Sequence, residues 1–212
     1  VLVCHRRFGK TVCMINHLIK SALMCKLKNP RFAYIAPTFK QAKSIAWDYM
    51  KQFTDKIPYI KFNETELRVD LPNGARITLL GAENSDGLRG IYLDGCVIDE
   101  YANVHSKLFP EIIRPALSDR KGYCVFIGTP AGMNNNFYEL YQHAQGAEDW
   151  FNYKAKASET KIVDEDELVK AKEVMGEKKY LQEFECDWIA NIEGAIFNDT
   201  LSKMEDGKQL TR

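Results

Sequence analysis

The segment that most constrains this chain lies at its beginning, where a short apolar run is followed by Cys-His-Arg-Arg-Phe-Gly-Lys-Thr at residues 4–11. It is similar to the phosphate-binding loop pattern G-x-x-x-x-G-K-[ST], which joins a buried strand to a helix. The second glycine, the lysine and the threonine are present as Gly9, Lys10 and Thr11, and Cys4 stands in place of the first glycine. If this motif is taken alone, the alternative to a phosphate-binding loop is a Gly-Lys-Thr sequence at the start of an ordinary helix.

Each retained residue of this loop has a chemical task. Gly9 lets the backbone approach a phosphate closely, and the N–H groups at the helix start hold an anion. Lys10 would reach the β- and γ-phosphates, and the hydroxyl of Thr11 would bind Mg²⁺. Together with Arg7 and Phe8, which precede them, these residues form the predicted nucleotide-binding loop.

A second motif lies further along the chain, where the apolar run Cys-Val-Ile at residues 96–98 ends in Asp99 and Glu100. A strand with two carboxylates at its end is the Walker B pattern of nucleotide hydrolases. Asp99 would hold Mg²⁺, directly or through water, and Glu100 would orient and activate the attacking water as general base. Taken alone, the pair could equally cap the next turn. Its place after the phosphate-binding loop, at the end of another predicted strand, favours the hydrolase interpretation.

A third predicted strand runs into Gly128, Thr129 and Pro130. A polar side chain here, beside the phosphate-binding loop, can sense the γ-phosphate, and Thr129 is the candidate. The alternative is a simple strand-exit turn, which glycine and proline favour. Ligands of open α/β sheets bind at the carboxyl ends of the strands, so the three strand ends together predict one nucleoside-triphosphate hydrolase site.

Two arginines are candidates for the finger that stabilises transition-state charge in phosphoryl transfer. Arg6 lies inside the phosphate-binding loop and could act within its own subunit. Arg89 lies in the glycine-flanked sequence Gly-Leu-Arg-Gly at residues 87–90 and could reach the site of a neighbouring subunit. For either residue, an ordinary solvated surface charge is the alternative.

The order of predicted elements indicates an α/β fold. Apolar runs alternate with stretches of helical apolar spacing, which favours parallel βαβ units in a central sheet flanked by helices. Alternating apolar residues on both sides of Pro72-Asn73-Gly74 predict an inserted β-hairpin, and prolines interrupt a helical stretch over residues 107–117. The other predicted strands lie at 1–3, 32–36, 95–98, 123–127 and 150–157, and the helices at 10–28, 41–54, 136–144, 164–175 and 177–187.

Composition narrows the class of protein. With 212 residues, 45% of them hydrophobic, the chain can bury the core of one domain with a small appendage, which excludes disorder as the main state. No apolar run approaches the length of a spanning helix, so no membrane partner is expected. The formal net charge is zero, so any binding of nucleic acid would need a local basic patch or another part of the protein. The cysteines form no C-x-x-C pair and the histidines are scattered, so we expect reduced thiols and no structural zinc.

Taken together, these motifs resemble the large terminase subunit of tailed bacteriophages. The resemblance rests on the Arg-Arg-Phe-Gly-Lys-Thr loop that lacks the first glycine, on Leu-Arg-Gly at 88–90, Val-Ile-Asp-Glu at 97–100 and Gly-Thr-Pro-Ala-Gly at 128–132. Tyr-Ile-Ala-Pro-Thr at 34–38 resembles the second-strand motif of that family. The resemblance runs from residue 1 to about residue 197 and includes Glu-Phe-Glu-Cys-Asp at 183–187.

The resemblance implies a P-loop NTPase fold and an ATPase motor that drives double-stranded DNA into a procapsid. Its implied partners are that DNA, the portal protein, the small terminase subunit and identical subunits in a ring. The implied location is the host cytoplasm, transiently at the portal vertex of the procapsid. ATP and Mg²⁺ are the implied cofactors, with Lys10 and Thr11 on the nucleotide and its metal.

The resemblance also assigns roles to the remaining candidates. Asp99 would be the metal carboxylate and Glu100 the catalytic base, while Thr129 would belong to the segment that couples hydrolysis to DNA movement. Arg6 matches the loop arginine of the family, and Arg89 matches an arginine proposed to act in trans in some members.

The resemblance divides the chain into an ATPase core at residues 1–149 and a small helical lid with a linker at residues 150–212. The adenine-contacting segment of the family precedes the first strand, and its RNase H-like nuclease domain follows the linker, so neither is expected in this chain. Asp199 and Asp206 are accordingly expected to be linker residues. Two other classes stay open, namely another P-loop DNA translocase or helicase-like ATPase, and a non-catalytic DNA-binding or scaffold protein with a degenerate loop.

Overall fold

The computed structural model describes residues 1–189, whose centre is one mixed sheet. Its strands are Leu2–Cys4 (β1), Arg31–Ala36 (β2), Lys61–Asn63 (β3), Arg68–Asp70 (β4), Arg76–Gly81 (β5), Gly95–Ile98 (β6), Tyr123–Gly128 (β7) and Tyr153–Ala155 (β8). They lie in the order β3-β4-β5-β2-β6-β7-β1-β8. All neighbours from β5 to β8 in this order pair in parallel, and β4 pairs antiparallel with both β3 and β5.

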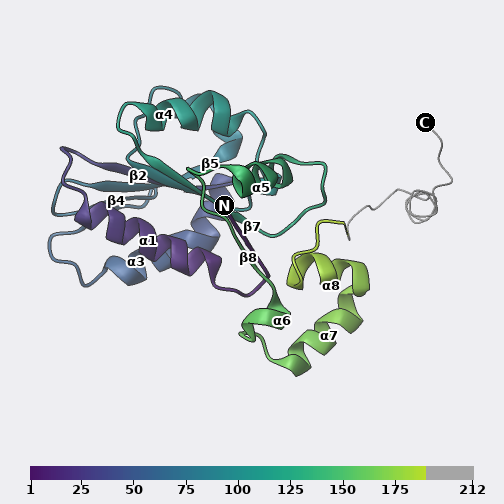
Figure 1. Ribbon diagram of the computed structural model, residues 1–212. Coiled ribbons are helices and arrows are strands. Elements are labelled where there is room, and N and C mark those ends of the chain that lie inside the picture. The colour runs from purple at the N-terminus through teal and green to yellow at the C-terminus, as the bar shows by residue number, and fades with distance from the viewer. Residues whose placement is uncertain (190–212) are drawn as a thin grey trace, which may run out of the picture.

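Helices cover both faces of the sheet (Figure 1). One face carries α1 (Lys10–Met24) and a continuous helix formed by α2 (Phe39–Ala42), the π-helical turn η1 (Lys43–Trp47) and α3 (Asp48–Thr54). The other face carries the π-helical turn η5 (Phe109–Ile113), α4 (Arg114–Ser118) and α5 (Asn136–Gly146). Single 3₁₀ turns occur at Ala82–Asn84 (η2), Asp86–Leu88 (η3) and Tyr101–Asn103 (η4).

The two faces of the sheet enclose two separate apolar cores, as a parallel sheet requires. Along β2, Tyr34 belongs to the core beneath α1, which also holds Ile15 and Leu18 of that helix. Its neighbour Ile35 belongs to the opposite core, which holds Phe137 of α5. Because successive side chains of β2 point alternately into two apolar cores, the strand is an unbroken apolar run in the sequence.

The predicted α/β fold with a mainly parallel sheet is confirmed, and the predicted hairpin forms as β4 and β5. The hairpin is not a separate insertion, because β5 also pairs with β2 along its whole length and so extends the sheet. Strand β3 was not predicted, since its residues Lys61–Asn63 are mostly exposed and carry no apolar alternation. Helix α1 ends at Met24, four residues before the predicted end, where Asn73 of the hairpin turn donates from Nδ2 to the carbonyl oxygens of Ala22 (2.9 Å) and Leu23 (3.2 Å).

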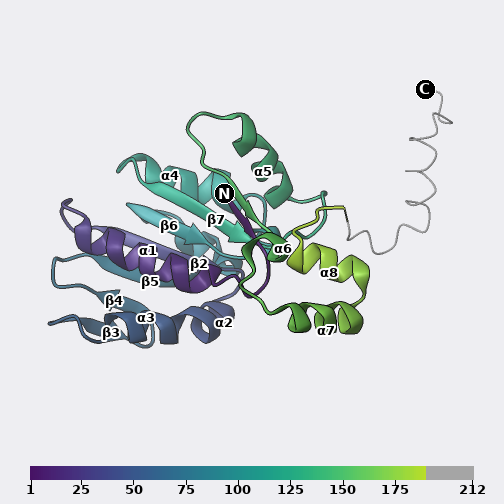
Figure 2. The same ribbon diagram turned by 60° about the horizontal axis from the view of Figure 1, so that its bottom comes forward.

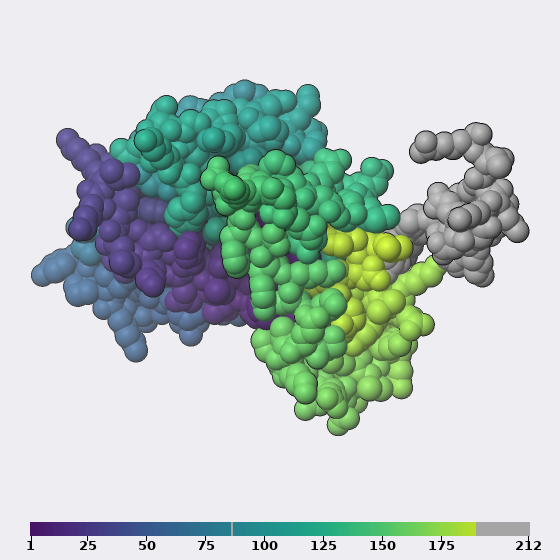
Figure 3. Space-filling view, in the orientation of Figure 1, coloured from purple at the N-terminus to yellow at the C-terminus, as the bar shows by residue number. Residues whose placement is uncertain are grey.

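The segment after residue 150 first adds a strand to the sheet and then continues into helices. Strand β8 pairs with β1, although it follows the predicted core boundary at residue 149. Helices α6 (Ala157–Thr160), α7 (Glu165–Met175) and α8 (Glu177–Phe184) then gather at one end of the molecule (Figure 2) and form a lobe beside it (Figure 3). The division into core and lid stays a prediction. Asp199 and Asp206 lie outside the described residues.

Among the helices of residues 1–189, we find none with the length and apolar character needed to cross a bilayer. The six cysteines, for which we expect reduced thiols, form no disulfide bond within the described residues, and Cys4, Cys96 and Cys186 are buried.

Candidate active site

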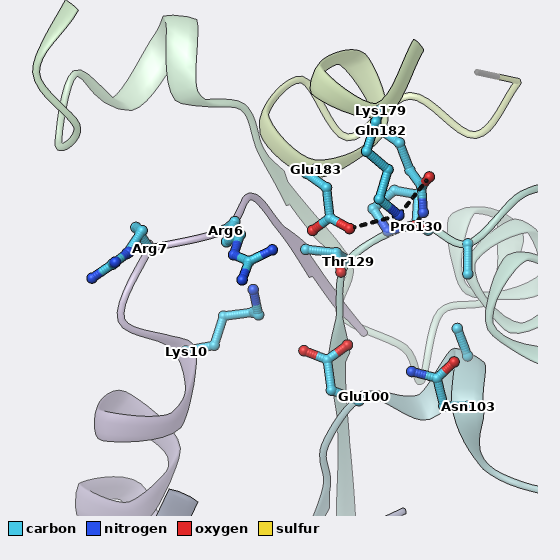
Figure 4. A pocket seen from close by; sticks show the side chains of 12 residues that line it. Arg6, Arg7, Lys10, Glu100, Asn103, Thr129, Pro130, Lys179, Gln182 and Glu183 are labelled. Atoms are coloured by element: carbon cyan, nitrogen blue, oxygen red, sulfur yellow. Dashed lines mark hydrogen bonds and ion pairs between the residues drawn. The ribbon is translucent and has the colours of Figure 1, made fainter. Parts of the chain in front are cut away.

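The three predicted strand ends meet at one edge of the sheet. In the order β6-β7-β1, each strand is the neighbour of the next, so the residues that follow them are brought together. A cavity of about 490 Å³ opens there (Figure 4). It is polar, and charged side chains from several elements line it: Arg6, Arg7, Lys10, Glu100, Ala102, Asn103, Thr129, Pro130, Ala131, Lys179, Gln182 and Glu183.

The phosphate-binding loop has the conformation that its glycine allows. Gly9 is the N-cap of α1 with φ 85° and ψ 19°, which is left-handed backbone. Cys4, in the place of the first glycine of the pattern, is the last residue of β1 and does not have a positive φ. A side chain is therefore tolerated there. Lys10 donates from Nζ to the carbonyl oxygens of Cys4 (3.0 Å) and His5 (3.1 Å), which holds its ammonium within the curve of the loop.

Thr11 and Asp99, predicted to share a metal ion, are in direct contact. The hydroxyl of Thr11 lies 3.3 Å from Oδ2 of Asp99 and donates to it. Asp99 is only 4% exposed, and its Oδ1 accepts the backbone N–H of Glu100 at 2.8 Å. The hydroxyl of Tyr34, from the neighbouring strand β2, also donates to Oδ2 of Asp99. Burial, followed by the charge of Asp99, raises the pKa of Tyr34, so its hydroxyl stays protonated.

Glu100 faces the cavity from a strained position. Its φ of 47° and ψ of 48° are left-handed, an uncommon conformation for a residue with a side chain. Burial raises the pKa of the Glu100 carboxyl above its ordinary value, and the charge of Asp99 raises it further, while Lys10 and a hydrogen bond from the backbone of Thr129 act in the opposite direction. A carboxylate with a raised pKa that faces a phosphate-binding loop is suited to accept a proton from water.

The remaining predicted residues differ in their placement. Arg6 points into the cavity beside Lys10, and Arg7 lies at its rim (Figure 4). Phe8 does not line the cavity, since its ring packs edge-on against His5 with 5.2 Å between centroids. Thr129 lines the cavity, whereas Arg89 does not: it is exposed on the loop between η3 and β6.

Helix α8 contributes residues that the sequence did not reveal as part of the site. The backbone N–H of Arg6 donates to the carbonyl oxygen of Glu183 at 2.8 Å. Gln182, only 3% exposed, donates from Nε2 to the carbonyl oxygen of Pro130 at 2.5 Å. Lys179 pairs with Glu183 across 3.0 Å. The run at residues 183–187 resembles the family, but no local pattern in the sequence indicates that it reaches the phosphate-binding loop.

His5 is a second residue that sequence reasoning left without a role. It is fully buried, with Nδ1 2.6 Å from the carbonyl oxygen of Arg6 and Nε2 2.8 Å from the hydroxyl of Thr160. Burial lowers the pKa of His5, so the ring is neutral, with Nδ1–H as the donor to Arg6 and Nε2 as the acceptor from Thr160. His5 thus connects the loop to α6.

Known phage proteins resemble this chain in sequence. The family model described as terminase large subunit, T4likevirus-type, N-terminal, matches residues 3–204. The terminase large subunit of Thermus phage G20c is 30% identical over 126 residues, which cover 50% of this chain and 26% of that protein. The corresponding protein of Thermus virus P23-45 is 29% identical over the same shares. The chain thus matches about a quarter of the length of these curated relatives.

Solved structures share the fold. The ATPase domain of the large terminase of Thermus phage P74-26 has a TM-score of 0.73 at 19% identity, covering 89% of this chain and 88% of that one. The large terminase of a thermophilic bacteriophage in complex with ADP has a TM-score of 0.74 at 17% identity, covering 89% of this chain and 48% of that one. The family model spans nearly all of the described residues. The chain therefore belongs to the terminase large subunit family and matches the N-terminal part of those proteins.

Proposed function

We propose that this chain is the ATP-hydrolysing part of a phage DNA-packaging motor. The observation that carries the proposal is the convergence of Lys10, Glu100 and Thr129 on one cavity, with Thr11 and Asp99 in contact beside it. The solved complex of a fold relative with ADP supports a nucleotide as the ligand. The membership of the terminase large subunit family supports the packaging role.

ATP and Mg²⁺ fit the side chains present. Lys10 and the N–H groups at the start of α1 supply positive charge and donors for the β- and γ-phosphates. Thr11 and Asp99 offer a hydroxyl and a carboxylate, the oxygen ligands that Mg²⁺ prefers. The described residues contain no cluster of three His, Cys, Asp or Glu side chains that could hold a metal ion. When bound, Mg²⁺ would neutralise charge on the phosphate oxygens.

Hydrolysis then follows from the protein groups around the phosphates. Glu100 accepts a proton from a water molecule as the water oxygen bonds to the γ-phosphorus. The bond between that phosphorus and the β–γ bridging oxygen breaks, which releases ADP and inorganic phosphate. Arg6 and Lys10 stabilise the negative charge that builds on the transferred group. Thr129 follows β7, the strand next to β6, and lines the same cavity, which it links to the loop before α5.

The wider role extends beyond this chain. We propose double-stranded DNA, the portal protein, the small terminase subunit and identical subunits in a ring as partners, in the host cytoplasm and transiently at the portal vertex. These partners follow from the family, because the cavity itself identifies only a nucleotide. We also propose that residues 150–212 act as lid and linker to the core at residues 1–149.

Removal of the Lys10 ammonium tests the proposal directly. Lys10→Ala should abolish ATP binding, because the phosphates lose their principal cation, and phosphate release should fall to background. Equilibrium binding of a fluorescent ATP analogue measures the first effect and a phosphate-release assay the second. Lys20→Ala, an exposed lysine further along α1, is the matched control and should bind as the wild type does. Unchanged affinity in Lys10→Ala would refute the nucleotide site.

A further inference from the structure

The hydroxyl of Tyr34 is a buried polar group without a packing purpose. Tyr34 lies in the middle of β2, has no exposed surface and is surrounded by the apolar core beneath α1. Phenylalanine would fill the same volume without a polar atom. A buried tyrosine hydroxyl requires a partner, and here the partner is Oδ2 of Asp99.

The pairing of two strands brings Tyr34 and Asp99 together. Strand β2 pairs directly with β6, with Ile35 opposite Ile98, and the backbone N–H of Asp99 donates to the carbonyl oxygen of Ile35 at 2.8 Å. The backbone of Asp99 is therefore fixed directly after β6, two residues beyond Val97, which lies opposite Tyr34. The tyrosine ring reaches along the sheet face toward the loop and ends at the carboxylate.

Three donors hold the Asp99 carboxylate. Oδ1 accepts from the backbone N–H of Glu100, and Oδ2 accepts from both Tyr34 and Thr11. The torsion that rotates a carboxylate is broad and weakly restrained on its own. Of the three donors, the Thr11 hydroxyl is also a predicted metal ligand and must then share its oxygen with the ion. Tyr34 is the side-chain donor to Oδ2 that remains for orientation alone.

We propose that Tyr34 is a positioning residue for metal binding, whose hydroxyl orients the Asp99 carboxylate toward the ion that Asp99 shares with Thr11. The inference rests on the proposed nucleotide site. Tyr34 would act through Asp99 and would not itself bind the nucleotide or the metal. Groups that orient a metal ligand typically change metal affinity or activity by about 10- to 100-fold when removed.

The test is Tyr34→Phe, which deletes one oxygen and keeps the ring. We expect the Mg²⁺ concentration that half-saturates metal-dependent binding of fluorescent ADP to rise about tenfold. Nucleotide binding in the presence of EDTA should not change. The control is Tyr123→Phe, the same deletion in a half-buried tyrosine at the amino end of β7, away from the site, and its Mg²⁺ midpoint should equal that of the wild type. An unchanged midpoint in Tyr34→Phe would overturn the inference.

A second measurement needs no nucleotide and so separates this inference from the proposed function. In denaturant unfolding of the ligand-free chain, Tyr34→Phe should lower the midpoint in the wild-type background. In an Asp99→Ala background it should have a smaller effect or none, because the hydroxyl has already lost its carboxylate partner. Equal effects in both backgrounds would overturn the contact. Absence of any Mg²⁺-dependent nucleotide binding by the wild type would instead refute the proposed function.

Discussion

At the residue scale, Gly9 is the position where backbone conformation decides the site. Its φ of 85° is left-handed, and a Cβ placed there would meet no atom within 4 Å. Gly9→Ala should therefore reduce the free energy of unfolding by about 1–2 kcal/mol through backbone strain alone. Gly146→Ala is the control, since Gly146 ends α5 with the same open space and no positive φ, and it should not reduce stability. Denaturant unfolding of both variants measures the difference, and equal stability would show that the loop relaxes.

Glu100 gives a second prediction at this scale. Because burial and Asp99 raise its pKa in the folded protein, ionisation of Glu100 opposes folding, and stability falls as the pH rises through that raised pKa. Glu100→Gln should therefore be more stable than the wild type at pH 7, and the gain should disappear below the ordinary glutamate pKa. Thermal unfolding across this pH range provides the measurement. A gain that persists at low pH would point to packing instead of charge.

The same substitution separates binding from turnover. Glu100→Gln should keep ATP binding and reduce hydrolysis at least 100-fold, since the amide cannot accept the proton of the attacking water. Single-turnover phosphate release together with nucleotide binding reports both steps. Normal hydrolysis by this variant would exclude Glu100 as the base.

The residues that the sequence predicted and those it missed differ in how they are recognised. Lys10, Thr11 and Asp99 follow predicted strands, and the carboxyl ends of parallel strands must meet, so their approach could be predicted without coordinates. The hydroxyl of Tyr34 sits inside an apolar run, where a tyrosine reads as core. Its contact with Asp99 depends on which strand lies beside β6, which periodicity along one strand does not specify.

At the element scale, the sequence predicted the existence of most elements better than their ends. β6 forms at the predicted residues because its apolar run stops at Asp99. Helix α1 stops early because the hairpin turn, 49 residues later in the chain, binds its last carbonyls through Asn73. The prolines at 110 and 115 do not break the helical stretch: Pro110 lies in its first turn, where a missing N–H is tolerated, and Pro115 lies where the π-helical turn η5 passes into α4.

Helix α8 yields the prediction at this scale. Its Gln182 is buried and donates to Pro130, so Gln182→Met, of similar volume, leaves that carbonyl oxygen without its donor. We expect a loss of about 1–3 kcal/mol in unfolding free energy. Gln52→Met on the exposed side of α3 is the control and should stay within about 0.5 kcal/mol of the wild type. If the two variants unfold alike in denaturant, α8 is not anchored through Gln182.

At the scale of the whole molecule, the position of Arg89 determines what it could do. It is exposed on a loop outside the cavity of its own chain, so action on a nucleotide would require a neighbouring subunit. Mixing full-length Arg89→Ala subunits with Glu100→Gln subunits in an assembled ring should restore part of the ATPase activity that each variant lacks alone. The measurement is ATPase rate against mixing ratio. No recovery in a ring shown to assemble would assign Arg89 a different role.

The attachment of α8 has a mechanical consequence. One turn of this helix is bound to the loops that follow two neighbouring strands, through Glu183 to Arg6 and through Gln182 to Pro130. Helix α7 adjoins α8 in the same lobe. We therefore expect a change in the separation of those two loops to tilt the helix pair about this double anchor, so that the far end of α7 moves further than the loops themselves.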